Sequence, residues 1–273
     1  MKKHLEKAII IENRSLTASI YHLVLKAPDI SKEARPGQFV MVRISDGLIP
    51  LLRRPFSFFR IRKDEGIVEI AYRLVGKGTM ALSRKKEGEE LDLLGPLGNG
   101  FRLPPAEVKT VWVLAGGIGI ASVMSLIEEI RLKRPDVHLV LYYGAKSSSD
   151  FLSISELSRL CSEVKYSTDD GSFGFCGSVL GCAVNDCEAS KVLPSYLYAC
   201  GPPVMLAHVA KWALQHNIPS QFSLESLMGC GVGACLGCAI PKKNELSNSP
   251  SYVHVCFEGP VFSPDVIKWE QYL

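Results

Sequence analysis

Three cysteines share one glycine-rich loop, Met228-Gly229-Cys230-Gly231-Val232-Gly233-Ala234-Cys235-Leu236-Gly237-Cys238, and Cys256 follows after 17 further residues. The spacing C-x4-C-x2-C followed by a distant cysteine is typical of plant-type [2Fe-2S] centres, which a short loop can wrap. The glycines let the backbone approach closely, so that N–H groups can point at the cluster sulfurs. A zinc site with four thiolates is the main alternative, although zinc sites usually hold two separate cysteine pairs. Disulfides are a further alternative. The spacing favours an iron–sulfur cluster with the ligands Cys230, Cys235, Cys238 and Cys256.

Length and composition indicate an ordinary globular chain. Its 273 residues are enough for about two domains, and 47% are hydrophobic and 22% charged. The net charge of +3, without any run of Lys or Arg, excludes the typical pattern of a nucleic-acid-binding protein. Residues 111–127 are uncharged, but their glycines predict a strand, a turn and a helix rather than a membrane span. With nine cysteines, which fit a reducing compartment, we expect a cytoplasmic protein without membrane association.

The predicted elements change character near residue 105. Before it, short strand-like runs between turn signals predict an antiparallel β-barrel of six strands, at residues 7–11, 21–26, 39–44, 56–61, 67–74 and 91–94. After it, strands alternate with helices, which predicts a parallel α/β domain. The expected fold is therefore β plus α/β with three domains: a barrel at 1–103, an α/β nucleotide-binding domain at 104–222, and a small cluster domain at 223–273.

Two neighbouring stretches of the predicted barrel favour phosphate binding. Arg54-Pro55-Phe56-Ser57 offers a bidentate guanidinium, which Pro55 aims, and a hydroxyl that can hydrogen-bond to a ring nitrogen. Ala71-Tyr72-Arg73 leads into Gly76-Lys77-Gly78-Thr79, where glycines let backbone amides approach a phosphate. We expect a helix at 79–86 with Thr79 as its N-cap. Each stretch alone also fits an ordinary turn or helix cap.

A second glycine motif favours a dinucleotide. Leu114-Ala115-Gly116-Gly117-Ile118-Gly119-Ile120-Ala121 follows a predicted strand and opens a helix, so Gly116, Gly117 and Gly119 are candidates for contact with a pyrophosphate. The strict G-x-G-x-x-G pattern fails at Ser122, and no acidic residue ends the next strand. Tight packing of a strand on a helix is the plain alternative. Lys146 at the end of that strand leaves NADPH open beside NADH.

In combination, R-P-x-S, G-x-G-T and G-G-x-G resemble the ferredoxin reductase family of flavoproteins, over essentially the whole chain. In that family the arginine and the G-x-G-T amides hold the FAD pyrophosphate, and the serine lies by the flavin N5. The resemblance implies that FAD is bound by Arg54, Pro55, Phe56, Ser57, Ala71, Tyr72, Arg73, Gly78 and Thr79.

The segment Ala199-Cys200-Gly201-Pro202-Pro203-Val204-Met205 resembles the C-G-P-x-x-M turn that lies beside the nicotinamide in the same family. The resemblance implies that Cys200, Gly201 and Pro202 contact NAD(H). It also implies that Ser57 and Cys200 lie next to the reacting atoms, as the candidate catalytic residues. A buried small apolar residue is the alternative reading of Cys200.

Within that family, the order of segments and the strings C-G-V-G-A-C-L-G-C and F-E-G-P-V-F are most similar to one branch, the electron-transfer subunits of two-subunit, NAD-linked dihydroorotate dehydrogenases. The resemblance implies a hetero-oligomer with an FMN-containing catalytic subunit that oxidises dihydroorotate in pyrimidine biosynthesis. Electrons would pass through the cluster and FAD to NAD+. Two alternatives stay open: the same redox module serving a hydrogenase, sulfite reductase or ferredoxin–NADP transhydrogenase, or a zinc-stapled binding protein without enzymatic activity.

Overall fold

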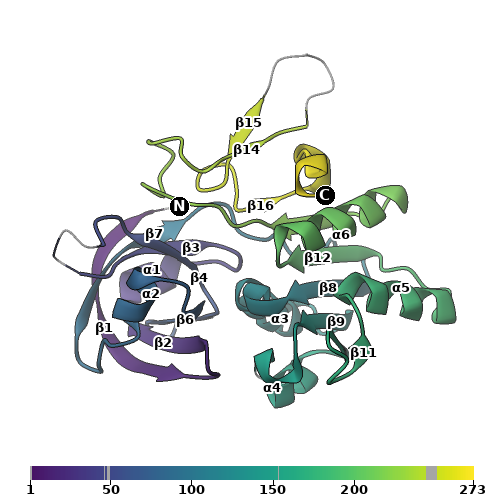
Figure 1. The fold of residues 1–273 in the computed structure, drawn as a ribbon, viewed down its shortest axis with the longest axis horizontal. Helices are drawn as coiled ribbons and strands as arrows, with labels where there is room; N and C mark the ends of the chain where they lie inside the picture. The colour runs from purple at the N-terminus through teal and green to yellow at the C-terminus, as the bar shows by residue number, and fades with distance from the viewer. Residues whose placement is uncertain (1, 46, 48–49, 153, 244–250) are drawn as a thin grey trace. The chain divides into compact units, whose positions relative to one another are not determined.

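The computed structural model describes residues 2–45, 47, 50–152, 154–243 and 251–273. Within these residues the chain forms two compact units (Figure 1). The first unit takes Met1–Phe101, Glu225–Ile240 and Tyr252–Val261, and the second takes Arg102–Leu224, Pro241–Ser251 and Phe262–Leu273. The four cysteines of the predicted cluster therefore lie in the same unit as the N-terminal strands.

The first unit is built on an antiparallel sheet in the order β4-β3-β7-β1-β2-β6-β5. Alternate side chains of these strands fill one core, which includes Leu23, Val42 and Ile70. The elements are β1 (His4–Ser15), β2 (Ile20–Lys26), α1 (Pro28–Glu33), β3 (Phe39–Arg43), β4 (Arg54–Ser57), β5 (Arg60–Arg62), β6 (Ile67–Arg73), α2 (Lys77–Leu82) and β7 (Glu90–Leu97).

The predicted barrel is confirmed, with seven strands where the sequence predicted six. The run at 56–61 divides into β4 and β5, because the chain changes partners at two buried phenylalanines. The Phe58 N–H donates to Gln38 O at 3.2 Å, beside β3, and the Phe59 N–H donates to Glu69 O of β6 at 2.8 Å. Since β4 and β5 are the two edges of the sheet, this short link connects the edges and curls the sheet on itself.

A short helix replaces one of the predicted turns. The sequence around Pro28 predicted only a turn, but α1 begins there, with proline at a position that needs no N–H donor. The Glu6 carboxylate accepts hydrogen bonds from the N–H groups of Asp29 (3.2 Å) and Ile30 (2.9 Å). This side chain comes from β1, so no local pattern at residue 28 could reveal the cap.

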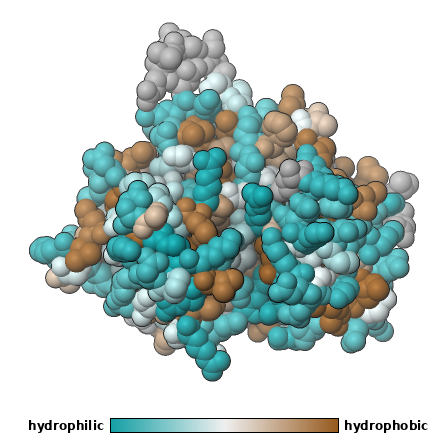
Figure 2. Space-filling model, turned by 180° about the vertical axis from the view of Figure 1, so that it is seen from behind, coloured by the Kyte–Doolittle hydropathy of each residue, from teal (hydrophilic) through white to brown (hydrophobic). Residues whose placement is uncertain are grey.

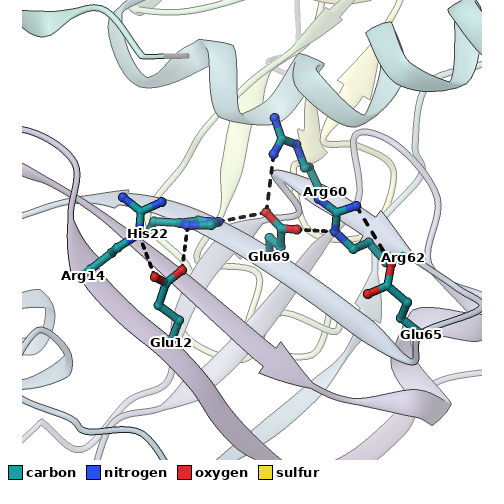
Figure 3. A network of polar contacts seen from close by, with 7 residues as sticks. All are labelled: Glu12, Arg14, His22, Arg60, Arg62, Glu65 and Glu69. Atoms are coloured by element: carbon teal, nitrogen blue, oxygen red, sulfur yellow. Dashed lines mark hydrogen bonds and ion pairs between the residues drawn. The ribbon is translucent and has the colours of Figure 1, made fainter. Parts of the chain in front are cut away.

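A polar network ties β2, β5 and β6 together on the side of the sheet away from the core (Figure 3). Glu69 is only 3% exposed, and its carboxylate lies 2.8 Å from His22 Nε2 and accepts a hydrogen bond of 2.5 Å from Arg62 Nε. Arg60 lies 3.8 Å from the same carboxylate. Burial acts to raise the pKa of Glu69, but His22 and Arg62 lower it to about 2. The ionised carboxylate therefore fastens the edge strand β5 to the barrel.

The second unit is a sheet in the order β11-β10-β9-β8-β12-β13-β16, and the pairs from β11 to β13 are parallel. Helices α3 and α4 pack together, as do α5 and α6, and the two pairs cover opposite faces of the sheet (Figure 1). This confirms the predicted α/β architecture. The elements are β8 (Thr110–Gly116), α3 (Ile120–Lys133), β9 (His138–Ala145), α4 (Ile154–Leu160), β10 (Glu163–Thr168), β11 (Phe175–Cys176), α5 (Val179–Ser190), β12 (Tyr196–Cys200), α6 (Pro203–Gln215), β13 (Ser220–Ser223) and β16 (Val261–Phe262), with 3-10 helices at Gly117–Gly119, Ser148–Asp150, Pro264–Val266 and Trp269–Tyr272.

The strand order of the second unit reverses next to β8. The chain proceeds from β8 to β9 and β10 on one side, then returns to place β12 on the other side of β8. In open α/β sheets, ligands bind at the carboxyl ends of the strands where the order reverses. The topology therefore directs attention to the residues that follow β8 and β12.

No helix among the described residues is long and apolar enough to cross a membrane. Figure 2 shows one face of the molecule, on which hydrophilic side chains predominate and apolar ones form small separate groups. The uncharged run at 111–127 is strand β8, a 3-10 turn and the start of α3, as the sequence predicted.

Candidate cofactor and electron-transfer sites

The structure brings the four predicted cluster ligands together as two pairs. Cys238 Sγ lies 3.2 Å from Cys256 Sγ, although 17 residues separate them in the chain. Cys230 and Cys235 form the second pair, because the Cys235 N–H donates to Cys230 Sγ at 3.3 Å and the two side chains interact. A [2Fe-2S] cluster takes two thiolates at each iron, so this paired arrangement fits its donor set.

Backbone N–H groups are aimed at three of these sulfurs. Val232 donates to Cys230 Sγ at 3.4 Å, Gly233 donates to Cys256 Sγ at 3.2 Å, and the Cys256 N–H donates to Cys238 Sγ at 3.4 Å. Such donors stabilise thiolate charge and tune the potential of an iron–sulfur centre. The expectation that the glycine-rich loop directs N–H groups at sulfur is confirmed.

The thiols of the predicted cluster ligands differ in acidity. Burial acts to raise the pKa of Cys230, but the N–H groups of Val232 and Cys235 lower it to about 6. Burial and the adjacent Cys238 thiol raise the pKa of Cys256 to about 12. Two thiols in contact cannot both ionise without a cation, and a bound metal supplies that charge. Among the described residues, no three His, Cys, Asp or Glu side chains surround a single point as ligands of one ion.

The predicted phosphate motif of the barrel is assembled around Arg54 and Gly78. Arg54 Nη1 donates to Leu52 O at 2.7 Å, which holds the guanidinium near the start of β4. A Cβ on Gly78 would lie 3.1 Å from Arg54 Nε, so the absence of a side chain lets α2 approach the arginine. The first N–H groups of α2 have no partners within the helix and are available to an anion beside Arg54.

The role of Thr79 needs a correction. The sequence predicted a helix that starts at Thr79 as N-cap, but α2 begins at Lys77 with Gly76 as N-cap. The Thr79 hydroxyl accepts hydrogen bonds from the N–H groups of Val75 (3.0 Å) and Gly76 (3.2 Å) and donates to Gly76 O. Since its hydroxyl is used inside this turn, Thr79 can offer a phosphate its backbone N–H.

The two predicted flavin strands lie side by side. Phe56 of β4 contacts Tyr72 of β6 edge-on, with 5.7 Å between ring centroids. Ala71 and Tyr72 are buried, and Arg73 Nε is a buried donor without a hydrogen-bond partner among the described residues. An anionic or carbonyl-rich ligand would satisfy that donor. Ser57 ends β4 opposite Phe39 of β3 and is half-buried.

Arg53 belongs to no sequence motif, but the structure gives it a positioning role. Its guanidinium donates to Asp92 O (2.7 Å) and to Asp92 Oδ1 (2.9 Å), which fastens the start of β4 to β7. The sequence contains two adjacent arginines, and only Arg54 matches the phosphate motif. Because Asp92 lies 39 residues further along the chain, no local signal identified Arg53 as the residue that positions its neighbour.

The two predicted nicotinamide motifs meet at the reversal point of the second unit. A Cβ on Gly119 would lie 2.4 Å from Cys200 O, and one on Gly116 would lie 2.4 Å from Met205 Sδ. Met205 Sδ would also lie 2.7 Å from a Cβ on Gly201. The turn after β8 therefore packs directly on the turn after β12, because the glycines at positions 116, 119 and 201 have no side chains. Cys200 is 1% exposed at the end of β12, and Pro202 is the N-cap of α6.

Two acidic residues from the turn after β10 lie next to the end of β9, a contact that the sequence of β9 alone could not predict. No acidic residue follows β9 itself, but the N–H groups of Asp169 and Asp170, after β10, donate to Ala145 O (3.1 Å) and Lys146 O (3.2 Å). Hydrogen bonds from Ser172 lower the pKa of Asp170. The backbone of Lys146 thus lies beside the turn that carries Asp169 and Asp170.

Comparison with known proteins agrees with this geometry. Residues 225–268 match the family described as the iron-sulfur cluster binding domain of dihydroorotate dehydrogenase B, and residues 113–211 match the oxidoreductase NAD-binding domain. The electron transfer subunit of dihydroorotate dehydrogenase B (NAD(+)) from Desulforamulus reducens is 39% identical over 252 residues, which cover 92% of this chain and 93% of that protein. This chain belongs to the family of dihydroorotate dehydrogenase B electron transfer subunits. The members from Enterococcus faecalis and Geobacillus kaustophilus are 35% and 36% identical, over 96% and 94% of this chain and 97% and 96% of their own.

Solved structures show the same fold at lower identity. The NADH-dependent reduced ferredoxin-NADP oxidoreductase, a flavin-based electron-bifurcating enzyme, matches with a TM-score of 0.83 and 24% identity, over 97% of this chain and 91% of that one. A ferredoxin NADP+ reductase from Neisseria gonorrhoeae, solved with FAD and NADP, matches with a TM-score of 0.63 and 19% identity, over 77% and 91% of the two chains. This chain therefore has the ferredoxin reductase fold, as the sequence predicted.

Proposed function

We propose that this chain carries electrons from a catalytic subunit that oxidises dihydroorotate, through a [2Fe-2S] cluster and FAD, to NAD+. The observation that carries the proposal is the pairing of the four cysteines within a chain that belongs to the dihydroorotate dehydrogenase B electron transfer subunits. Bound FAD supplies the required conversion, because it exchanges a hydride with nicotinamide and single electrons with an iron–sulfur cluster.

Different residues of the barrel would bind different parts of FAD. Arg54 and the N–H groups of Gly78 and Thr79 bind the pyrophosphate, where positive charge and unpaired donors coincide. The buried donor of Arg73 takes a polar group of the cofactor, while Pro55, Phe56, Ala71 and Tyr72 supply the wall beside it. Ser57, at the end of β4, would lie next to the flavin N5 and would orient the ring for hydride exchange.

The second unit binds NAD(H) at the crossing of its two glycine turns. Gly116, Gly117 and Gly119 let the pyrophosphate approach the start of α3. Cys200, Gly201 and Pro202 would lie beside the nicotinamide, where Cys200 would contribute a small apolar surface that helps to exclude water. The proposed division of labour is 1–103 for FAD, 104–222 for NAD and 223–273 for the cluster.

The partner would be an FMN-containing dihydroorotate dehydrogenase subunit that docks over the cluster. Three large apolar side chains around the cluster loop support this: Leu227, Leu236 and Phe257 are 91%, 58% and 61% exposed. Exposed apolar groups of this size usually mark protein contacts. The nine cysteines of the sequence fit a reducing compartment and so favour an assembly in the cytoplasm.

An anaerobic titration with NADH tests the proposal. The chain, co-purified with its partner, should show flavin absorbance and a broad iron–sulfur absorbance, and NADH should bleach both. Dihydroorotate should bleach both only when the partner is present. A colourless protein that contains zinc and no flavin would refute the redox assignment, and bleaching by NADH without any response to dihydroorotate would refute the partner assignment.

A further inference from the structure

The segment Leu97-Gly98-Asn99, at the end of β7, contacts both parts of the chain that supply the cluster cysteines. The sequence marks it only as part of a turn, Gly95-Pro96-Leu97-Gly98-Asn99-Gly100. Its partners lie more than a hundred residues away, in the cysteine loop and in the turn after Cys256, within the same compact unit. No motif analysis assigns it a role.

Asn99 makes three hydrogen bonds to the turn after Cys256. Its Nδ2 donates to Phe257 O at 3.1 Å and to Glu258 O at 2.9 Å, and its backbone N–H donates to Gly259 O at 2.6 Å. The amide therefore spans consecutive carbonyl groups directly after the fourth cysteine. These contacts fix the direction in which the chain leaves Cys256.

Gly98 completes the contact by allowing close approach. It has φ of +73°, and a Cβ there would lie 2.5 Å from Pro260 Cδ and 2.8 Å from Gly259 O. A side chain at this position would push the turn after Cys256 away. The buried Gln38 amide donates to Gly98 O at 2.7 Å, so the segment is itself held by the barrel.

The cysteine loop packs on the same part of the barrel. Gly231 follows Cys230 with φ of +75°, and a Cβ there would lie 2.5 Å from Met41 Cγ and 3.2 Å from Leu97 Cδ1. Leu97 and Asn99 thus support the two cysteine-bearing segments, which are also joined to each other by the pairing of β14 (Ala239–Pro241) with β15 (Tyr252–His254) and by hydrogen bonds to the cysteine sulfurs.

We propose that Asn99 is a positioning residue for the iron–sulfur cluster, which fixes Cys256 relative to the loop that carries the other three thiolates. The inference rests on the proposed function, because it requires that the cysteines bind a cluster. Asn99 acts through the backbone of residues 257–259 and touches no ligand sulfur. Its removal should loosen the Cys256 side of the cluster while the FAD residues on β4, β6 and α2 keep their geometry.

The test uses Asn99→Ala and Asn99→Asp in the full chain with its partner. Asparagine 13 gives a matched control, because Asn13 Nδ2 also bridges two carbonyls, Leu82 O (2.8 Å) and Lys85 O (3.0 Å), in the same unit. We expect Asn99→Ala to release iron to a chelator roughly five- to thirtyfold faster than wild type, as the loss of its two side-chain hydrogen bonds implies. Asn99→Asp should release iron at least as fast, since a carboxylate would face two carbonyl oxygens. Asn13→Ala should release iron at the wild-type rate.

Two further readouts separate positioning from general destabilisation. The electron paramagnetic resonance signal of the reduced cluster should broaden or shift in the Asn99 variants, while the FAD content per chain stays unchanged. Iron release at the wild-type rate in both variants would overturn the inference. So would loss of FAD together with iron, because that result describes an unfolded barrel. A wild-type chain without iron and sulfide would instead refute the proposed function, and the inference with it.

Discussion

The glycine at position 119 offers the sharpest test of the proposed NAD(H) site. In Gly119→Ala, the new Cβ would lie 2.4 Å from Cys200 O, 2.6 Å from Cys200 C and 2.8 Å from Gly201 N. All three atoms belong to the backbone, so neither turn can relieve the contact by rotating a side chain. The turns must separate by roughly 1 Å to restore ordinary contact, and overpacking of this kind costs about 1–3 kcal/mol. Misplacement of about 1 Å at a site that positions substrate can lower the rate about a hundredfold.

We therefore expect Gly119→Ala to lower kcat/KM for NADH by about ten- to a hundredfold, with FAD and iron contents unchanged. The assay is the rate of flavin bleaching by NADH in an anaerobic stopped-flow instrument, with dithionite as a reductant that needs no binding site. Gly181→Ala in α5 is the matched control, since its Cβ would meet side-chain atoms alone, Ser178 Oγ at 3.2 Å and the Phe175 ring at 3.5 Å. Wild-type bleaching by NADH in Gly119→Ala would refute the reasoning.

Three further predictions concern the first unit. Arg54→Ala should weaken FAD binding by about ten- to a hundredfold, because it removes a charged hydrogen-bond donor to the phosphate. A fluorescence titration with FAD measures the affinity, and Arg43→Ala, at an exposed arginine, is the control. Cys256→Ser should lose iron and the broad visible absorbance but keep FAD, as metal and flavin analysis would show. Glu69 should make the free energy of unfolding depend on pH, because folding lowers the pKa of its carboxyl from 4.5 to about 2. The ionised carboxylate therefore contributes about 3 kcal/mol to the free energy of unfolding above pH 4.5, and this contribution is lost as the pH falls toward 2. Denaturant melts of Glu69→Gln should therefore lack this dependence, and an unchanged pH profile would contradict the assignment.

The sequence revealed features whose causes are local. The cysteine spacing, the strand–turn–helix context of Gly116 and Gly119, and the alternation of strands and helices after residue 105 each depend on residues close together in the chain. The structure has the paired cysteines, the strand–turn–helix at Gly116 and Gly119, and the α/β domain that these patterns predicted. The family resemblance predicted the ferredoxin reductase fold. The meeting of the two nicotinamide motifs followed from parallel strands that end at one edge of a sheet.

The misplaced features depend on residues far apart in the chain. The division of one predicted strand into β4 and β5 follows from the change of partner at Phe58, which involves Gln38 and Glu69. The start of α2 at Lys77 is the exception, because its cause is local. The Thr79 hydroxyl accepts hydrogen bonds from the N–H groups of Val75 and Gly76, and the residue types allow a cap at either position. The contacts of Asn99 span 158 and 159 residues, so only the folded chain could identify its partners.

The residues proposed to hold the two one-electron centres lie within one compact unit, and the structure connects them through few residues. Gly231 of the cysteine loop packs on Met41 of β3, and Met41 pairs in register with Pro55 of β4, the residue next to Arg54. Single-electron transfer falls off steeply with the separation of the centres, so direct packing of the cluster loop on the strand beside the flavin motif keeps that separation constant. Hydride exchange has a different requirement, because the nicotinamide must reach contact distance with the flavin. The residues proposed to hold NAD(H) belong to the other unit, so the proposed one-electron step and the binding of the two-electron carrier fall to different compact units.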